Sequence, residues 1–481
     1  MPPTSRPSAL PRRPAGFRNR RIVPCAPCVQ EKACASGRTT EALRTHAIVL
    51  RGLTENRSRI RDALHAGVTN GIEVASRLTT TQCAAPQSVV QGPRRARGMQ
   101  IQYRHWNAAH GWRGANALRE PAQLVLYFGG REGLAGGERY RELRGFYPDS
   151  HIVGCSTGGQ IHGDDIADDV IVAVALHFAR TQVRVVNETI ESRDASRVCG
   201  MRFARQLAAP DLAGVFVLSD GLNVNGNELI AGITEVLGPD LLVTGGLAGD
   251  GNRLKQTLVG ADGEPQPNRI AAIGFYGASF RFAHGCAGGW DVFGPRRKVT
   301  KSEGSVVAEL DGEPPLDLYT RYLGEEEVAA MPGSGLAFPL RIHDEAAPDR
   351  QIVRSVFAVD RDARTLTFAA DIPEGCTAQL MRANFDSLAA GAGEAGRQAR
   401  SALADGIAGD KLAILVSCTG RRKVMGQRTQ DELDAVAAEL GDDVVRIGFY
   451  SYGEIAPPAA TGRCELHNQT MTVTMIAEAA A

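Results

Sequence analysis

Near-continuous apolar runs alternate with helical periodicity along most of the chain, and one arrangement of them occurs three times. Each copy has the order apolar strand, amphipathic helix, apolar strand, apolar strand, and the copies span 124–178, 214–276 and 412–477. Apolar runs without polar alternation predict strands that are covered on both faces, and a period of 3.6 residues predicts a helix between them. The short steps from the second strand to the third predict antiparallel neighbours. The predicted fold class is therefore α/β, with mixed β-sheets and repeated strand–helix–strand–strand units.

The region between the second and third copies has a different pattern. An alternating stretch at 297–312 predicts one strand that ends in a turn, and a helix is expected over 315–323 with proline at its first position. Alternating strands follow within 350–382, and a small-residue helix is expected near 386–403. The stretch at 325–335 is acidic and then rich in proline and glycine, which favours a hinge between two lobes.

Charge is distributed unevenly, although the whole chain of 481 residues has a formal net charge of zero. Residues 1–98 contain 17 Lys+Arg against 5 Asp+Glu, and Phe17 is their single aromatic residue. Such a segment buries too little apolar surface to offset the entropy of ordering, so we expect a disordered basic leader. Translation that begins at Met99 is one explanation; a nucleic-acid-binding arm and an organelle transit peptide are alternatives.

The rest of the chain predicts a cytoplasmic globular protein. No apolar run approaches the 18 or so residues that a membrane-spanning helix needs, and we expect neither a membrane nor a nucleic-acid partner. Cys25, Cys28 and Cys34 have a spacing that could bind zinc, but no second ligand pair follows. The other cysteines are scattered singly, as is typical of reduced proteins. No metal site is predicted.

Polar side chains that follow the strands of the third copy are the main candidates for ligand binding. Arg421, Arg422, Gln427 and Arg428 follow the strand at 412–416, and Glu454 ends the next strand of this copy. Guanidinium groups pair bidentately with carboxylates, and a carboxylate suits a ligand ammonium group. Loops after neighbouring strands tend to converge on one site. The alternative is that these charged groups pair with each other or with the protein's own carboxylates at 431 and 432 across a surface loop.

Three further groups have both a structural and a chemical interpretation. Asn223 lies in a loop before a helix, where it could bind a ligand, whereas turn formation and N-capping explain its neighbours Asn225 and Asn227. Two neighbouring arginines would favour the Cys418 thiolate, but no histidine that could act as a base lies nearby before His467, so packing as a buried small residue is the favoured interpretation. Ser156 lies in a G-x-S-x-G pattern that resembles a hydrolase nucleophile elbow, but a loop follows it instead of a helix. Hydrolase chemistry is an alternative function, and no catalytic residue is predicted.

A series of short sequence motifs resembles those of the FIST family in composition and order. The motifs lie at 152–158, 218–221, 245–250, 299–304, 310–312, 417–422 and 426–429. The resemblance implies a FIST N-terminal domain over 99–324 and a FIST C-terminal domain over 325–481. It further implies a cytoplasmic sensory protein that binds a small ligand such as an amino acid. No kinase, cyclase or methyl-accepting segment is recognisable, so the output is expected to pass to a separate signalling protein.

The same resemblance makes a haem-based nitric-oxide sensor an alternative. No Cys-x-x-Cys-His attachment motif exists, so a haem would need an axial histidine. No cofactor is otherwise expected, and a non-enzymatic binding role is the prediction. The candidate axial ligands are His151, His162, His177, His284, His343 and His467.

Overall fold

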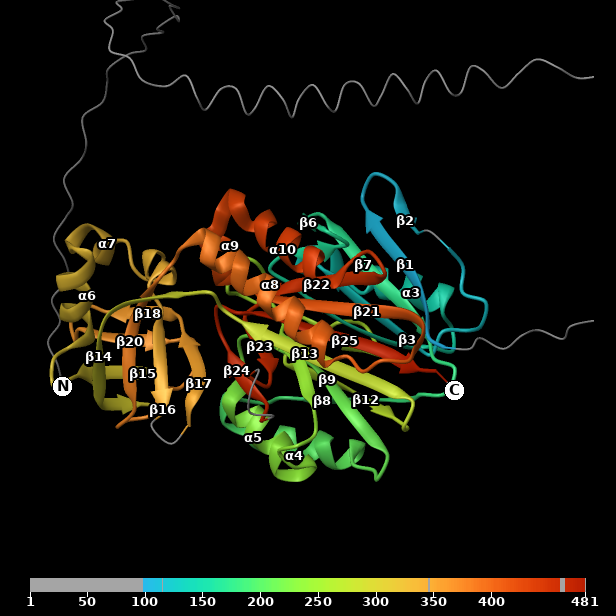
Figure 1. The fold of residues 1–481 in the computed structure, drawn as a ribbon, viewed down its shortest axis with the longest axis horizontal. Helices are drawn as coiled ribbons and strands as arrows, with labels where there is room; N and C mark the ends of the chain where they lie inside the picture. The colour runs from blue at the N-terminus through green and yellow to red at the C-terminus, as the bar shows by residue number, and fades with distance from the viewer. Residues whose placement is uncertain (1–97, 115, 345–346, 459–462, 481) are drawn as a thin grey trace, which may run out of the picture. The chain divides into compact units, whose positions relative to one another are not determined.

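The computed structural model describes residues 98–480 except 115, 345–346 and 459–462 (Figure 1). All but the last residue of the predicted basic leader therefore lies outside the described part. Within that part, the strands form three mixed six-stranded sheets and one antiparallel seven-stranded sheet. The α/β class and the mixed sheets that the sequence predicts are confirmed. No helix of the described residues is long and apolar enough to cross a bilayer.

The three predicted copies are three structural units, each extended by one strand at its start. In every unit the sheet order is second strand, first strand, third strand, starting strand; the first two strands are parallel and the other pairs antiparallel. Unit 1 contains β1 (Gln100–Asn107), β3 (Leu124–Gly129), α3 (Glu138–Phe146), β4 (His151–Ser156) and β7 (Val170–His177). Unit 2 contains β8 (Gln182–Thr189), α4 (Ser196–Leu207), β9 (Leu212–Ser219), α5 (Gly226–Leu237), β10 (Val243–Leu247) and β12 (Arg269–Tyr276). Unit 3 contains β13 (Phe280–Ala287), α8 (Phe385–Ala402), β21 (Ile407–Cys418), α10 (Gln430–Leu440), β22 (Val444–Ser451) and β25 (Met471–Ala479).

Each unit gives one short strand to the sheet of another unit, in a cyclic order. Unit 1 provides β5 (Gln160–His162) to unit 3, unit 2 provides β11 (Val259–Ala261) to unit 1, and unit 3 provides β23 (Gly453–Ala456) to unit 2. Equivalent loops are joined by three equivalent backbone hydrogen bonds. Their donors and acceptors are Gly158 to Tyr450 at 2.7 Å, Gly249 to Ser156 at 2.9 Å, and Tyr452 to Leu247 at 3.2 Å. The units are therefore related by an approximate threefold arrangement.

One glycine in the second strand of each unit is required by this packing. A Cβ atom at Gly154, Gly245 or Gly448 would lie 2.2, 1.9 or 2.0 Å from a carbonyl oxygen of the first strand of the same unit. No side chain fits at such a distance, so the same steric demand selects glycine three times.

The three sheets share an inner core and are covered by helices on the outside. Phe128, Phe216 and Phe449, one from each unit, are fully buried in the inner core. Separate apolar clusters lie under α3, under α4 and α5, and under α8 and α10. Burial on both faces is the reason for the near-continuous apolar runs. The three units together are here called the body. Its remaining elements are β2 (Gly111–Arg113), α2 (Arg131–Leu134), β6 (Asp165–Ala167), η1 (Arg193–Ala195), α9 (Thr419–Met425), η3 (Gly426–Thr429) and β24 (Glu465–His467).

Residues 291–382, here called the lobe, are inserted into unit 3 and form the seven-stranded sheet, coloured yellow to orange in Figure 1. The lobe has its own core, in which Tyr319 and Leu366 are fully buried. Its elements are β14 (Asp291–Glu303), β15 (Val306–Leu310), α6 (Pro315–Leu323), α7 (Glu325–Ala329), η2 (Ser334–Ala337), β16 (Leu340–Asp344), β17 (Ala347–Arg354), β18 (Val356–Asp360), β19 (Thr365–Phe368) and β20 (Thr377–Arg382).

Three local predictions are wrong. The stretch at 297–312 is part of a hairpin of two strands, because Gly304, with a φ of 55°, turns the chain. The stretch at 325–335 is not a hinge, because Val328 and Met331 are buried in the core of the lobe. The loop expected after Ser156 contains β5 and β6, which pair with each other and extend the sheet of unit 3.

Candidate functional site

A cavity of about 300 Å³ lies between the body and the lobe. On the body side it begins where β9, β10, β21 and β22 end, which is where α/β sheets place ligands. On the lobe side it is lined by the start of β18 and by the residues around the end of β19. Its volume is at the lower end of the range for small-molecule sites.

Most of the lining is apolar. Val224 and Phe368 are buried in the wall, and Leu336 and Val356 extend it on the lobe side. Leu254, in the same wall, remains 49% exposed. The cavity therefore offers an apolar surface to a small ligand.

Three polar atoms in the lining are buried and have no hydrogen-bond partner among the described residues. They are the hydroxyl oxygens of Ser355 and Thr419 and the amide oxygen of Asn468. Ser355 is 5% exposed and Asn468 is 1% exposed. Leaving a buried polar group unsatisfied costs about 1–3 kcal/mol. Such groups are expected to bond to a ligand or to water.

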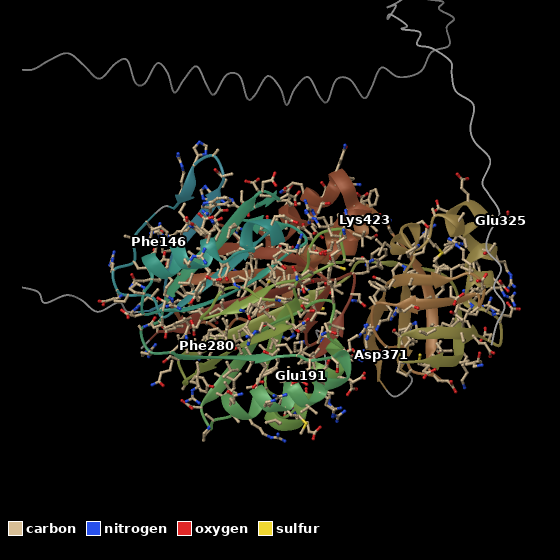
Figure 2. All side chains as sticks on the ribbon, turned by 180° about the vertical axis from the view of Figure 1, so that it is seen from behind. Phe146, Glu191, Phe280, Glu325, Asp371 and Lys423 are labelled. Carbon is tan, nitrogen blue, oxygen red and sulfur yellow. The ribbon has the colours of Figure 1, made fainter. Side chains whose placement is uncertain are left out.

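The charged side chains in the lining are all cationic. Lys423 and Arg193 line the cavity and are exposed, so they lie at its open edge. Neither makes an ion pair within the described part of the chain. Figure 2 shows Lys423 and Asp371 in the region where the body meets the lobe.

Two buried carboxyl groups lie behind the lining and do not reach the cavity surface. Glu454 accepts hydrogen bonds from the hydroxyls of Ser451 at 2.7 Å and Thr470 at 2.9 Å. Burial raises the pKa of Glu454 to about 7, although these hydrogen bonds oppose the rise. Burial also raises the pKa of Asp250, but hydrogen bonds from the Tyr452 hydroxyl and three backbone amides outweigh it, so that the pKa is lowered overall.

A second cavity, of about 830 Å³, lies on the same face at the ends of β3 and β4. Arg422 lines it and donates two hydrogen bonds to Asp168, at 2.6 and 2.8 Å, and one to the carbonyl oxygen of Gly158 at 2.7 Å. These hydrogen bonds lower the pKa of Asp168. The Arg422 guanidinium also lies 5.1 Å from the centre of the Tyr450 ring. Thr419 and Lys423 line both cavities.

The structure does not bring the three predicted arginines together. Arg421 is fully buried, donates to Glu432 at 2.6 Å, and also donates to the carbonyl oxygens of Gly288 and Leu388. Arg428 is exposed and pairs with Asp431 and with a second aspartate on α8. Their pairing with protein carboxylates is the alternative that the sequence left open. The expectation of one shared arginine cluster is wrong, because Arg422 is the only one of these three arginines that lines one of the two cavities.

The other candidate ligand contacts are also dispersed. Gln427 is exposed in η3 and lines neither cavity, and Glu454 is buried behind Ser451. The Asn223 side chain donates to Asn268 at 3.3 Å and does not line the first cavity, although its neighbour Asn225 does. Asn225 is the N-cap of α5, as the sequence suggested.

Neither candidate nucleophile has the surroundings of one. Burial raises the pKa of the Cys418 thiol to about 12, which agrees with its interpretation as a buried small residue and not with the thiolate alternative. The Ser156 hydroxyl is fully buried, donates to the carbonyl oxygen of Gly249 at 2.8 Å and accepts from the Leu258 amide at 2.8 Å. No histidine forms a hydrogen bond with either residue among those described.

The candidate axial histidines do not fit a haem in these cavities. Neither cavity is lined by a histidine in the described part of the chain. His151 instead pairs with Asp262, and His177 and His467 lie within hydrogen-bonding distance of backbone carbonyl oxygens. The haem alternative therefore has no axial histidine in either space.

Comparison with known proteins assigns the class. The model of the FIST N domain matches residues 123–313, and the model of the FIST C domain matches residues 315–457. The chain belongs to the FIST family, whose domains are sensory domains of signal-transduction proteins. It is also similar to uncharacterized proteins of Mycobacterium tuberculosis strains CDC 1551 / Oshkosh and H37Rv. Each is 25% identical over 340 residues, which cover 68% of this chain and 84% of the relative.

Sequence reasoning missed most of the cavity. Ser355 and Val356 lie far in sequence from the strands of the three repeated units. Neither they nor Asn468 belong to a recognisable sequence motif. Lys423 lies within the predicted ligand-binding stretch, but the prediction assigned ligand binding to the neighbouring arginines. The sequence feature that locates part of the cavity is the position of the loops that follow the strands.

Proposed function

We propose that this FIST protein is a cytoplasmic sensor that binds a small metabolite in the 300 Å³ cavity between the body and the lobe. Ligand occupancy is passed to a separate signalling protein. The observation that carries the proposal is the position of the cavity at the ends of β9, β10, β21 and β22, together with unsatisfied polar groups in its wall.

The two walls of the cavity suggest how ligand binding is transmitted to the rest of the protein. One wall belongs to the body and the other to the lobe, and the chain passes between these parts next to β13 and α8. Polar contacts that join the parts around the cavity include three hydrogen bonds: Asn225 donates to Asp371 at 3.2 Å, Arg354 donates to the carbonyl oxygen of Leu466 at 3.0 Å, and Gln469 donates to the carbonyl oxygen of Leu336 at 3.1 Å. A ligand that touches both walls shifts the position of the lobe by as much as its affinity for the two arrangements differs.

A binding role, rather than catalysis, is the part of the proposal that the nucleophile geometry supports. The Ser156 hydroxyl is occupied by backbone partners, and the Cys418 thiol holds its proton at neutral pH. The cytoplasmic location is supported by the cysteines at 155, 199, 286, 418 and 464, none of which forms a disulfide bond among the described residues.

The test is a thermal-shift screen of the full-length protein against a library of amino acids, organic acids and other small metabolites. A ligand at 100 times its Kd stabilises the folded state by about 2.7 kcal/mol. Ala369 lines the cavity on the lobe side, and Ala369→Trp fills the space. Ala363→Trp, in an exposed turn of the same lobe, is the matched control.

We expect at least one ligand whose stabilising effect is lost in Ala369→Trp and retained in Ala363→Trp. A library in which no compound shows this difference contradicts the proposed site.

A further inference from the structure

We infer that the ligand is a small organic monoanion with an apolar body, of the carboxylate class, and not a zwitterionic amino acid. This inference rests on the proposed function, because it concerns the same cavity. It follows from the charges, the apolar wall and the unsatisfied hydroxyl groups of the lining.

The charge of the lining selects against an ammonium group. Lys423 and Arg193 are cationic, and no aspartate or glutamate of the described residues lines the cavity. The nearest buried carboxyl groups are enclosed: Asp250 accepts from three backbone amides at 2.9–3.0 Å, and Glu454 accepts from Ser451 and a neighbouring threonine. An amino acid would carry its positive charge into a space that offers no negative partner, whereas a carboxylate meets unpaired cations.

The apolar wall fits the rest of such a ligand. Leu254 of the body and Phe357 of the lobe both line the cavity and are each 49% exposed, so a ligand would remove apolar surface from water on both walls. Leu336, Val356 and Phe368 continue this surface inward. A volume of about 300 Å³ limits the apolar body to a short chain or a single ring.

The unsatisfied hydroxyl groups provide donors for the anion. The hydroxyls of Ser355 and Thr419 lack partners among the described residues, and a hydroxyl donates a strong hydrogen bond to a carboxylate oxygen. Ser355 belongs to the lobe and Lys423 to the body, so one carboxylate that binds both would link the two parts. The Asn468 amide can serve as a further donor or acceptor.

The experiment compares matched compounds on the full-length protein by isothermal titration calorimetry. Phenylacetate, phenylacetamide and phenylalanine share a ring but differ in charge, and hexanoate, hexanamide and norleucine do the same for a chain. We expect a carboxylate to bind at least tenfold more tightly than its amide and its amino acid. Lys423→Met should weaken the carboxylate by roughly tenfold and leave the amide unchanged. Lys301→Met, an exposed lysine outside the cavity, should change neither.

The outcomes separate this inference from the proposed function. Amides or amino acids that bind as tightly as carboxylates, with binding that Ala369→Trp abolishes, overturn the anion class and leave the sensory site intact. Equal carboxylate affinities in Lys423→Met and Lys301→Met also overturn it. Failure of the whole metabolite library to give any ligand sensitive to Ala369→Trp overturns both.

Discussion

The buried carboxyl group of Glu454 should make the stability of the protein depend on pH in a direction opposite to that of most carboxylates. Burial raises the pKa of Glu454 from 4.5 to about 7. Between these two values the folded protein holds a proton that the unfolded chain has released, so the free energy of unfolding falls as pH rises. The stabilising contribution is complete below pH 4.5 and is lost as pH rises through 7.

The size of the effect follows from the two pKa values. Each pKa unit corresponds to about 1.4 kcal/mol, so the full loss is about 3 kcal/mol. Glutamine has no charge at any pH and keeps one of the two oxygens of Glu454, which accept from Ser451 and Thr470 respectively. We therefore expect Glu454→Gln to gain about 2–3 kcal/mol relative to the wild type between pH 5 and pH 8.

The assay is urea denaturation followed by circular dichroism at pH 5, 6, 7 and 8 and constant ionic strength. The difference between the variant and the wild type is the relevant quantity, because His284 and His343, whose pKa values are lowered by burial, add a pH dependence of their own that both proteins share. Glu325→Gln, at an exposed site on α7, is the control and should show no change with pH. A difference for Glu454→Gln that stays constant from pH 5 to pH 8 would refute the reasoning.

Two other substitutions test the buried arginine and the glycine packing. Arg421→Met leaves Glu432 buried without its cation and should destabilise the protein by about 3–5 kcal/mol, whereas Arg428→Met, at an exposed ion pair, should cost less than about 1 kcal/mol; equal midpoints in urea would contradict this. Gly245→Ala places a Cβ atom 1.9 Å from a carbonyl oxygen of β9, and we expect a loss of about 3 kcal/mol or more. Gly145→Ala, in α3 with no atom within 4 Å of the added carbon, should stabilise by about 0.5–1 kcal/mol; a melting temperature that moves the same way in both variants would contradict the steric argument.

The repeated units could be predicted from the sequence because their cause is local. Strands such as β3, β9 and β21 are covered by the inner core on one face and by helices on the other, so almost every position is apolar. Helix α6 begins and ends at the expected residues, since a proline marks its start, and Asn225 is the N-cap of α5 as the sequence suggested.

The exchanged strands could not be predicted in the same way. β5 and β11 are three residues long, which is too short for a periodic signal, and their partners belong to other units. A loop was therefore the natural expectation after Ser156. The positions at which the chain turns inside the lobe, such as Gly304, were equally hidden within alternating sequence.

The candidate site shows a different limit. Sequence located the loops after the strands of the third copy, and Thr419 and Lys423 in these loops do line the cavity. It could not show which guanidinium groups point inward to protein partners, because Glu432 and the carbonyl oxygen of Leu388 reach Arg421 only in the folded chain. The residues of the lobe that line the cavity lie next to no motif from which a binding site could be predicted.

The exchange of strands between units has a consequence for the two FIST domains as separable pieces. The boundary near residue 314 divides the sequence, but β5 and β13 before it pair with β22 and β25 after it, and β23 after it pairs with β10 before it. A fragment that carries either half alone would leave bare sheet edges, which promote aggregation. The family name describes two domains, whereas in the folded chain both halves contribute strands to the same sheets.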